Sequence, residues 1–454
     1  MAGNDLDTVG NLDGEQEVWP EGFPQKNALR NPGRHLPSKR RLLVDTDPEA
    51  VPEPNSDRYL PSRRRLLGQA LRGLAGAGAL SPFLHSGRAF GELPARPVDV
   101  VLPGRLGNPA LTLLEDERLH PRVRRALGAA PPGGPGASLP RVTLSSSYEQ
   151  CLNWVSAMER MLMSQDAAAL AAMPAFDEIV ARKEVIPRGD GSDISLYLDV
   201  PKNRGGKLPC IVHVHGGGMA FSTARRPLTA RWRKTLAEEG LLVVGIEFRN
   251  AGGVLGNHPF PGGLNDCASA VQWVHANRAS LDISSLVVAG ESGGGNLAIA
   301  TAVKANYEGW VGAIDGVFAM APMILGFYTS VPPELISWRE NQGYQGTNEM
   351  MRAMTKVYDP QDEHETNPMA WPFHATESDL QGLPPHIITN YELDLIRDDG
   401  ALFSRKLQQA GVSALSRTID GALHVPEIAM PDLVPELTRE TVRSLVGFAN
   451  SLQS

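Results

Sequence analysis

Beyond residue 184 the chain alternates short runs of β-branched and other apolar residues with segments of helical periodicity. The runs lie at 194–200, 209–215, 241–248, 286–290, 316–320, 386–391 and 414–419. Apolar residues at helical spacing fill many of the intervals between them, for example at 228–239, 264–278, 294–306 and 399–410. This α/β alternation predicts a mostly parallel central sheet flanked by helices on both faces. Binding sites in such sheets form at the carboxyl ends of the strands.

The segment between residues 96 and 180 has a different pattern. Residues 111–127 and 148–173 have the spacing of amphipathic helices, and a linker rich in Pro and Gly separates them at 129–140. A later insert at about 325–371 is rich in Trp, Met, Tyr and Pro. We expect residues 96–180 and this insert to form a helical cap over the strand ends of the α/β domain, which comprises residues 181–454.

Residues 1–95 are predicted to be a mostly disordered extension. Half of the 36 prolines, 18, lie in residues 1–140, and the first 25 residues contain six acidic residues but no Lys or Arg. Such a composition cannot bury enough apolar surface to offset the entropy lost on ordering the chain.

Within this extension, residues 62–67 read SRRRLL and precede a mildly apolar stretch rich in Gly and Ala at 73–84. That order is typical of a twin-arginine export signal. The long preceding segment and Arg72, beside the apolar stretch, instead favour a basic amphipathic segment or a flexible arm, and with it a cytoplasmic protein. We slightly favour this second interpretation.

Composition argues against several classes of function. The formal net charge of -8 gives no general attraction for a phosphate backbone, so we expect no nucleic-acid partner. Cys151, Cys210 and Cys267 form no CxxC pair, so neither a disulfide framework nor a zinc cluster is indicated. No apolar run reaches the roughly 18 residues needed to cross a bilayer, and we expect no stable membrane insertion.

The strongest motif lies at the end of the predicted strand at 286–290. Residues 290–294 read GESGG, a G-x-S-x-G pattern between a strand and a helix. A Cβ atom at Gly290 or Gly294 would collide with neighbouring backbone, so glycine permits a tight strand-to-helix turn there. The turn exposes the hydroxyl of Ser292 and directs the amide of Gly293 toward a bound group. Ser292 is therefore the candidate nucleophile.

A second Gly-rich motif lies at the end of the predicted strand at 209–215. His215, Gly216, Gly217 and Gly218 bring backbone amides to the same end of the sheet. Acyl transfer needs two or three amides at about 3 Å from the developing oxyanion. We expect Gly217 and Gly218, together with the amide of Gly293, to supply them. A phosphate-binding loop is the alternative, but no Lys-Ser/Thr pair follows this motif.

A serine nucleophile needs a base, and the base needs a carboxylate that orients it. Asp394 follows the predicted strand at 386–391, and His424 follows the next strand, at 414–419. The two side chains could therefore meet Ser292 at one edge of the sheet. Asp398 is a second acidic candidate, which we expect instead to cap the following helix. Glu291 could tune His424, but we favour a supporting hydrogen bond for it.

Together these motifs resemble those of the hormone-sensitive-lipase-like family of α/β-hydrolases, over roughly residues 109–450. They occur in the family order: HGGG at 215–218, GESGG at 290–294, Asp394 with Arg397 and Asp398, and then His424. The elbow at 290–297 is most similar to that of brefeldin A esterase and its relatives. Where the family usually has Tyr-Arg-Leu, this chain has FRN at 248–250.

The resemblance implies an α/β-hydrolase fold and a serine carboxylesterase with Ser292, Asp394 and His424 as its catalytic triad. It implies no metal and no cofactor, and we expect a small or medium-chain ester as the small-molecule substrate. An amidase or deacetylase with the same triad is one alternative. A non-catalytic small-molecule receptor on this fold is another. The sequence does not indicate an oligomeric state.

Overall fold

The computed structural model describes residues 102–130, 139–188, 190–203, 205–326 and 328–452. The predicted extension at 1–95, its possible export signal and most of the Pro/Gly linker lie outside the described residues. Within the described ranges, no helix has the length and apolar character needed to span a membrane.

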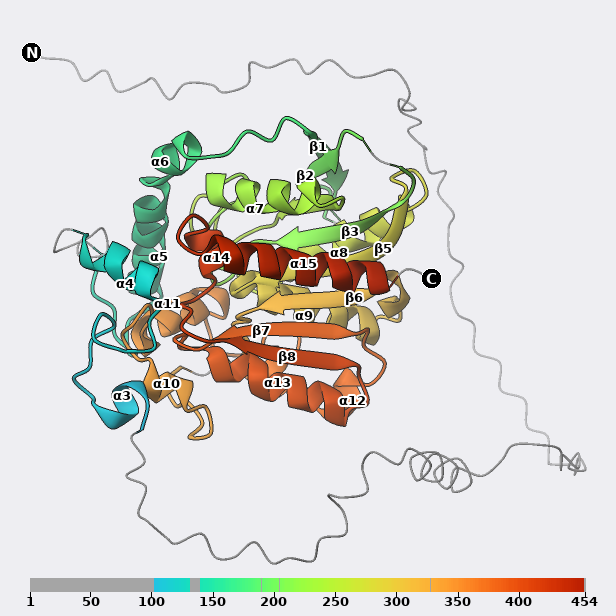
Figure 1. Cartoon of the computed structure of the whole chain (residues 1–454). Helices are drawn as coiled ribbons and strands as arrows, with labels where there is room; N and C mark the ends of the chain where they lie inside the picture. Colours follow the sequence, from blue (N-terminus) through green and yellow to red (C-terminus); the bar gives the residue numbers. More distant parts are fainter. Residues whose placement is uncertain (1–101, 131–138, 189, 204, 327, 453–454) are drawn as a thin grey trace, which may run out of the picture. The chain divides into compact units, whose positions relative to one another are not determined.

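An eight-stranded sheet forms the centre of the fold (Figure 1). Its order is β1-β2-β4-β3-β5-β6-β7-β8, in which β2 is antiparallel to both neighbours and all other pairs are parallel. The predicted α/β class, with a mostly parallel sheet, is confirmed. The strands are β1 (Ile179–Pro187), β2 (Asp193–Pro201), β3 (Leu208–Val214), β4 (Leu242–Glu247), β5 (Ile283–Glu291), β6 (Gly316–Met320), β7 (His386–Tyr391) and β8 (Ala414–Ile419).

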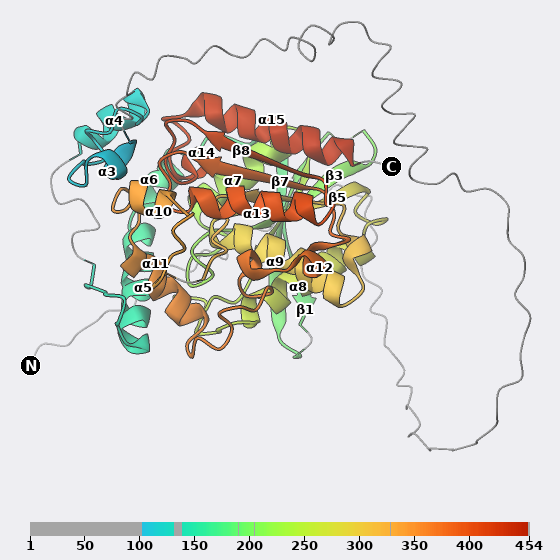
Figure 2. The same ribbon diagram turned by 90° about the horizontal axis from the view of Figure 1, so that it is seen from below.

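Helices cover both faces of the sheet (Figure 2). Successive side chains of a strand point to opposite faces, so Ile211 and Val212 of β3 belong to different core clusters. Val212 shares a cluster with residues of α8 (Gly262–Ala276), α9 (Gly293–Tyr307) and α13 (Arg397–Gln409). Ile211 shares the other with residues of α7 (Pro227–Glu238) and α15 (Pro435–Ser451). Four of these five helices, all except α15, lie within two residues of their predicted bounds.

The two helices predicted at 111–127 and 148–173 differ from the structure. Residues 111–120 form turns, and α4 begins only at Pro121 because proline, which lacks an amide hydrogen, is favoured in the first turn of a helix. The second prediction corresponds to two helices, α5 (Tyr148–Met163) and α6 (Asp166–Ala171), with a break at Ser164 and Gln165. The Ser164 hydroxyl donates to the Met161 carbonyl at 2.6 Å, where α5 ends.

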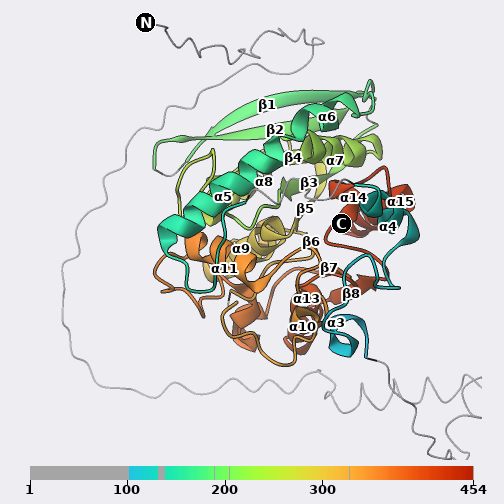
Figure 3. The same cartoon turned by 90° about the vertical axis from the view of Figure 1, so that its left-hand side faces the viewer.

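Helices from two distant segments lie at the carboxyl ends of the parallel strands. In Figure 3, which shows this side of the molecule, α5 crosses in front of the strand ends, and it contacts α11 of the insert. Most of the shorter helices lie on the same side in Figure 1. The helices not yet delimited are α3 (Gly104–Gly107), α4 (Pro121–Gly128), α10 (Ser337–Glu340), α11 (Asn348–Tyr358), α12 (Glu377–Leu380) and α14 (Pro426–Ala429), with 3-10 turns at Val311–Ala313 and Pro372–His374.

A buried ion pair joins α7 to β2. Arg233 Nε lies 2.8 Å from Asp199 Oδ2, and the two side chains are only 4% and 2% exposed. Burial raises the pKa of Asp199, and the charge of Arg233 partly offsets this effect. The carboxylate therefore depends on Arg233 for its charged form.

Replacing Arg233 with Met should lower the free energy of unfolding by about 3–5 kcal/mol, because Asp199 would stay buried without its partner. Arg231→Met on the same helix is the matched control. Its partner Asp432 is 69% exposed, and exposed pairs contribute only about 0–1 kcal/mol. Urea denaturation followed by circular dichroism measures both variants. Equal losses in the two would contradict the prediction.

Candidate active site

The carboxyl ends of β3, β5, β7 and β8 bring the predicted site residues to one cavity of about 390 Å³. Residues from six separate parts of the sequence line it. They include Gly216, Gly217, Gly218, Glu291, Ser292, Asp394 and His424.

Ser292 occupies the turn between β5 and α9. Its φ of 56° and ψ of -120° lie in a region that residues with side chains rarely adopt. The Ser292 amide donates to the Met320 carbonyl at 2.8 Å, and the Met323 amide donates to the Ser292 carbonyl at 3.0 Å. The end of β6 and the loop after it thus hold the strained turn in place.

Glycines allow this turn to pack directly against the loop after β3. A Cβ atom at Gly293 would lie 2.6 Å from the amide nitrogen of Gly218, and one at Gly290 would lie 2.7 Å from the carbonyl oxygen of Val214. At Gly294 a Cβ atom would collide with the same carbonyl. No side chain fits at these three positions without moving the backbone.

The loop after β3 offers free amides beside Ser292. Gly217 and Gly218 have φ values of 115° and 60°, which glycine tolerates and other residues rarely adopt. Their amides donate to no acceptor among the described residues. The Gly293 amide, at the first position of α9, has no partner within that helix either. The three amides predicted to hold an oxyanion are therefore available.

Two polar side chains hold the loop in this shape. Glu291 accepts a hydrogen bond from the Gly216 amide at 2.7 Å and lies 2.9 Å from His213 Nε2. His215 Nδ1 lies 2.8 Å from the Gly216 carbonyl, and its ring stacks on Phe248 with 4.3 Å between centroids. Burial lowers the pKa of His215 to about 4, so this ring is neutral at pH 7. Glu291 makes a supporting hydrogen bond, as expected, but from a buried position.

Asp394 and His424 form a hydrogen-bonded pair. His424 Nδ1 lies 2.7 Å from Asp394 Oδ2, and Asp394 Oδ1 accepts a bond from the Ile396 amide at 3.2 Å. Burial disfavours the charged imidazole, but the carboxylates of Asp394, Glu291 and Glu427 outweigh it and raise the pKa of His424. A proton on Nδ1, facing Asp394, would leave Nε2 as the basic nitrogen. Among the described residues Ser292 and His424 share the cavity but not a hydrogen bond.

Asp398 takes a different position from the one expected. Its carboxylate accepts hydrogen bonds from the Ser337 amide and from Arg397 Nε, both at 2.8 Å. Ser337 is the first residue of α10. The prediction that Asp398 caps its own helix is therefore wrong, because it caps a neighbouring helix of the insert.

Two side chains of the insert support the pair and were not predicted. Gln345 Oε1 accepts a hydrogen bond from the His424 amide at 2.6 Å. Asn341 Nδ2 donates to the carbonyl oxygens of Glu392 and Asp394, both at 2.9 Å. Asn341 and Gln345 lie 51 to 79 residues before the residues that they bond, so no local sequence motif marks them.

The described residues contain no group of three or more His, Cys, Asp or Glu side chains that could hold a metal ion. The groups that line the cavity include the Ser292 hydroxyl, the His424 imidazole and the Asp394 carboxylate.

Comparison with known proteins identifies the family. A family described by its alpha/beta hydrolase fold matches residues 211–427. The solved structure of brefeldin A esterase, described as a bacterial homologue of human hormone-sensitive lipase, is 37% identical with a TM-score of 0.72. The match covers 78% of this chain and 99% of that one. This chain belongs to the hormone-sensitive-lipase-like family of α/β-hydrolases.

Two further proteins are also similar to this chain. The solved structure of esterase Est22 is 31% identical, with a TM-score of 0.66 and coverage of 75% of this chain and 99% of that chain. Carboxylesterase NlhH from Mycobacterium tuberculosis is 30% identical over 270 residues, which are 58% of this chain and 80% of the relative. The family resemblance seen in the sequence motifs is confirmed.

The position of Asp394 in this α/β-hydrolase generates a prediction. Asp394→Asn should lower kcat by on the order of 10³- to 10⁴-fold, because an amide does not fix the His424 tautomer. Asp398→Asn is the matched control and should change kcat by less than about tenfold, since Asp398 contacts Ser337 and Arg397 instead. Steady-state hydrolysis of a p-nitrophenyl ester measures both. A larger loss in Asp398→Asn would overturn the assignment.

Proposed function

We propose that this α/β-hydrolase is a carboxylic ester hydrolase and that Ser292 forms the acyl-enzyme. One observation carries the proposal: the Asp394–His424 pair, the strained Ser292 turn and the free amides of the Gly217 loop border one cavity. Brefeldin A esterase, carboxylesterase NlhH and esterase Est22 are all named as esterases, which supports ester hydrolysis as the reaction.

The proposed reaction has two similar halves. His424 Nε2 removes the proton from Ser292 Oγ as this oxygen attacks the ester carbonyl carbon. Asp394 stabilises the charged imidazole, and the amides of Gly217, Gly218 and Gly293 hold the oxyanion. His424 then protonates the leaving alcohol, and the acyl group stays on Ser292. Water, deprotonated by His424, then attacks the acyl carbon. The bond from this carbon to Ser292 Oγ breaks, the acid leaves, and His424 returns the proton to Oγ.

The cap residues that line the cavity support a small or medium-chain substrate. Trp154 and Met158 of α5 face the same space as Met350 and Met354 of α11. A volume of about 390 Å³ lies near the lower end for small-molecule sites. The flexible methionines could adapt to acyl groups of different shapes. Residues 96–180 and 325–371 would therefore act as the cap, on a catalytic domain at 181–454.

Ser292→Ala should lower kcat by at least about 10⁴-fold and leave the melting temperature unchanged, because only the nucleophilic oxygen is removed. Ser222 also lines the cavity, with its hydroxyl unbonded among the described residues, so Ser222→Ala is the matched control. It should retain activity within a few-fold of the wild type. Substantial activity in Ser292→Ala would contradict the assignment.

Rates on p-nitrophenyl esters should peak at acyl chains of about two to eight carbons and fall for palmitoyl, because the cavity is small. The matching p-nitroanilides test the amidase alternative in the same assay. A sharp rise in rate on long-chain emulsions would contradict the size prediction. Faster cleavage of anilides would favour the amidase.

A further inference from the structure

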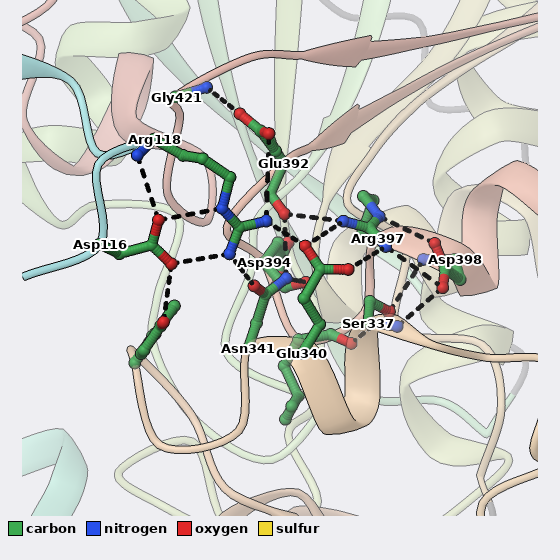
Figure 4. Close-up of polar contacts among 12 residues, drawn as sticks. Asp116, Arg118, Ser337, Glu340, Asn341, Glu392, Asp394, Arg397, Asp398 and Gly421 are labelled. Atoms are coloured by element: carbon green, nitrogen blue, oxygen red, sulfur yellow. Dashed lines mark hydrogen bonds and ion pairs between the residues drawn. The ribbon is translucent and has the colours of Figure 1, made fainter. Parts of the chain in front are cut away.

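A cluster of charged and polar side chains joins the N-terminal segment to the loops that carry Asp394 and His424 (Figure 4). We call it the Arg118 cluster. Its side chains come from three separate segments, and half of them are buried while the others are partly exposed. The cluster consists of Asp116, Arg118, Glu340, Asn341, Glu392 and Arg397.

Arg118 is the centre of the cluster. Its guanidinium donates to Asp116 at 3.0 Å through Nε and at 2.7 Å through Nη2, and it also bonds the Glu340 carboxylate. Nη2 further donates to Asn341 Oδ1 at 3.3 Å. A guanidinium holds five N–H donors in a fixed planar fork, whereas the ammonium of Lys has three donors on one nitrogen, so Lys cannot reproduce this set of bonds.

The bond from Arg118 fixes the orientation of the Asn341 amide. Asn341 is fully buried, and because its oxygen faces Arg118, its NH₂ group faces the loop after β7. There it donates to the carbonyl oxygens of Glu392 and Asp394, both at 2.9 Å. Asn341 therefore holds the backbone of the residue whose side chain contacts His424.

The same loop is tied to the loop that carries His424. Glu392 Oε2 accepts a hydrogen bond from the Gly421 amide at 2.6 Å, and the Leu393 amide donates to the Ala422 carbonyl at 3.0 Å. From the N-terminal segment, the His120 amide donates to the Gly421 carbonyl at 3.1 Å. A shift of Asn341 would therefore be transmitted to both partners of the Asp394–His424 contact.

The charge balance of the cluster also argues against a role in stability alone. Two arginines, Arg118 and Arg397, face the three carboxylates of the cluster, and Arg397 also pairs with Asp398 beside it. Removing such charges from water is costly, and an apolar contact of the same volume often stabilises a fold equally well. What an apolar contact cannot supply is the directed pair of bonds from Asn341 to the two carbonyls.

We propose that Arg118 and Asn341 are positioning residues for the Asp394–His424 pair, acting through the backbone of the loop after β7. The inference rests on the proposed role of that pair in ester hydrolysis. A displacement of about 1 Å at a catalytic group can lower the rate by on the order of 100-fold.

The test is the kinetic comparison of Asn341→Ala and Arg118→Lys with the wild-type full chain on p-nitrophenyl acetate. Both variants should lower kcat by about 10- to 100-fold and change KM by less than about twofold, since neither residue lines the cavity. The acid limb of the pH profile should move to lower pH. The reason is that Asp394 raises the pKa of His424, and the variants weaken this contact. The pKa of His424 should therefore fall, although Glu291 and Glu427 stay in place and still raise it.

Two further variants separate the possible outcomes. Arg122→Gln changes an exposed arginine of the same segment and should have wild-type kinetics. His424→Ala should be inactive, and activity in this variant would refute the proposed function itself. Wild-type kcat and pH profile in Asn341→Ala, with His424→Ala inactive, would overturn the positioning role alone. If Asn341→Ala is insoluble, Arg118→Lys decides the matter, and a wild-type kcat there would overturn the role.

Discussion

The close approach of two stretches of bare backbone, the turn around Ser292 and the loop after β3, is the constraint on which the site depends. A Cβ atom at Gly293 would lie 2.6 Å from the Gly218 amide nitrogen, and one at Gly294 would collide with the Val214 carbonyl. The glycines that permit this contact also permit the strained φ of 56° at Ser292. The strained turn thus places the Ser292 hydroxyl beside the amides of Gly217 and Gly218, which have no acceptor among the described residues.

The electrostatics of the cavity complement this geometry. Carboxylates of Asp394, Glu291 and Glu427 favour the charged form of His424 against the effect of burial. That charged form is the one a general base reaches when it takes a proton from serine. His215 has the opposite environment, since burial keeps it neutral and leaves it a structural part of the loop. The two histidines therefore have different roles, which their surroundings determine.

The sequence predicted the parts of this molecule that local patterns encode. Strands β2 to β8, the turn at Ser292 and the HGGG loop follow from short apolar runs and glycine motifs, and parallel strands bring their ends to one edge. β1 was missed because its residues are mostly half-buried or exposed, so its apolar pattern is weak. Asn341, Gln345 and Arg118 were missed for another reason. Their partners lie far away in the sequence, and only the folded chain joins them.

The central claim is that Ser292, His424 and the glycine amides act together on one carbonyl group. A crystal structure of the protein inactivated with a p-nitrophenyl alkylphosphonate, a mimic of the tetrahedral intermediate, tests it most directly. The account predicts phosphorus bonded to Ser292 Oγ, a phosphonyl oxygen about 3 Å from the amides of Gly217, Gly218 and Gly293, and His424 Nε2 within hydrogen-bonding distance of Oγ. Phosphorus on another residue, or an oxygen directed away from these amides, would contradict it.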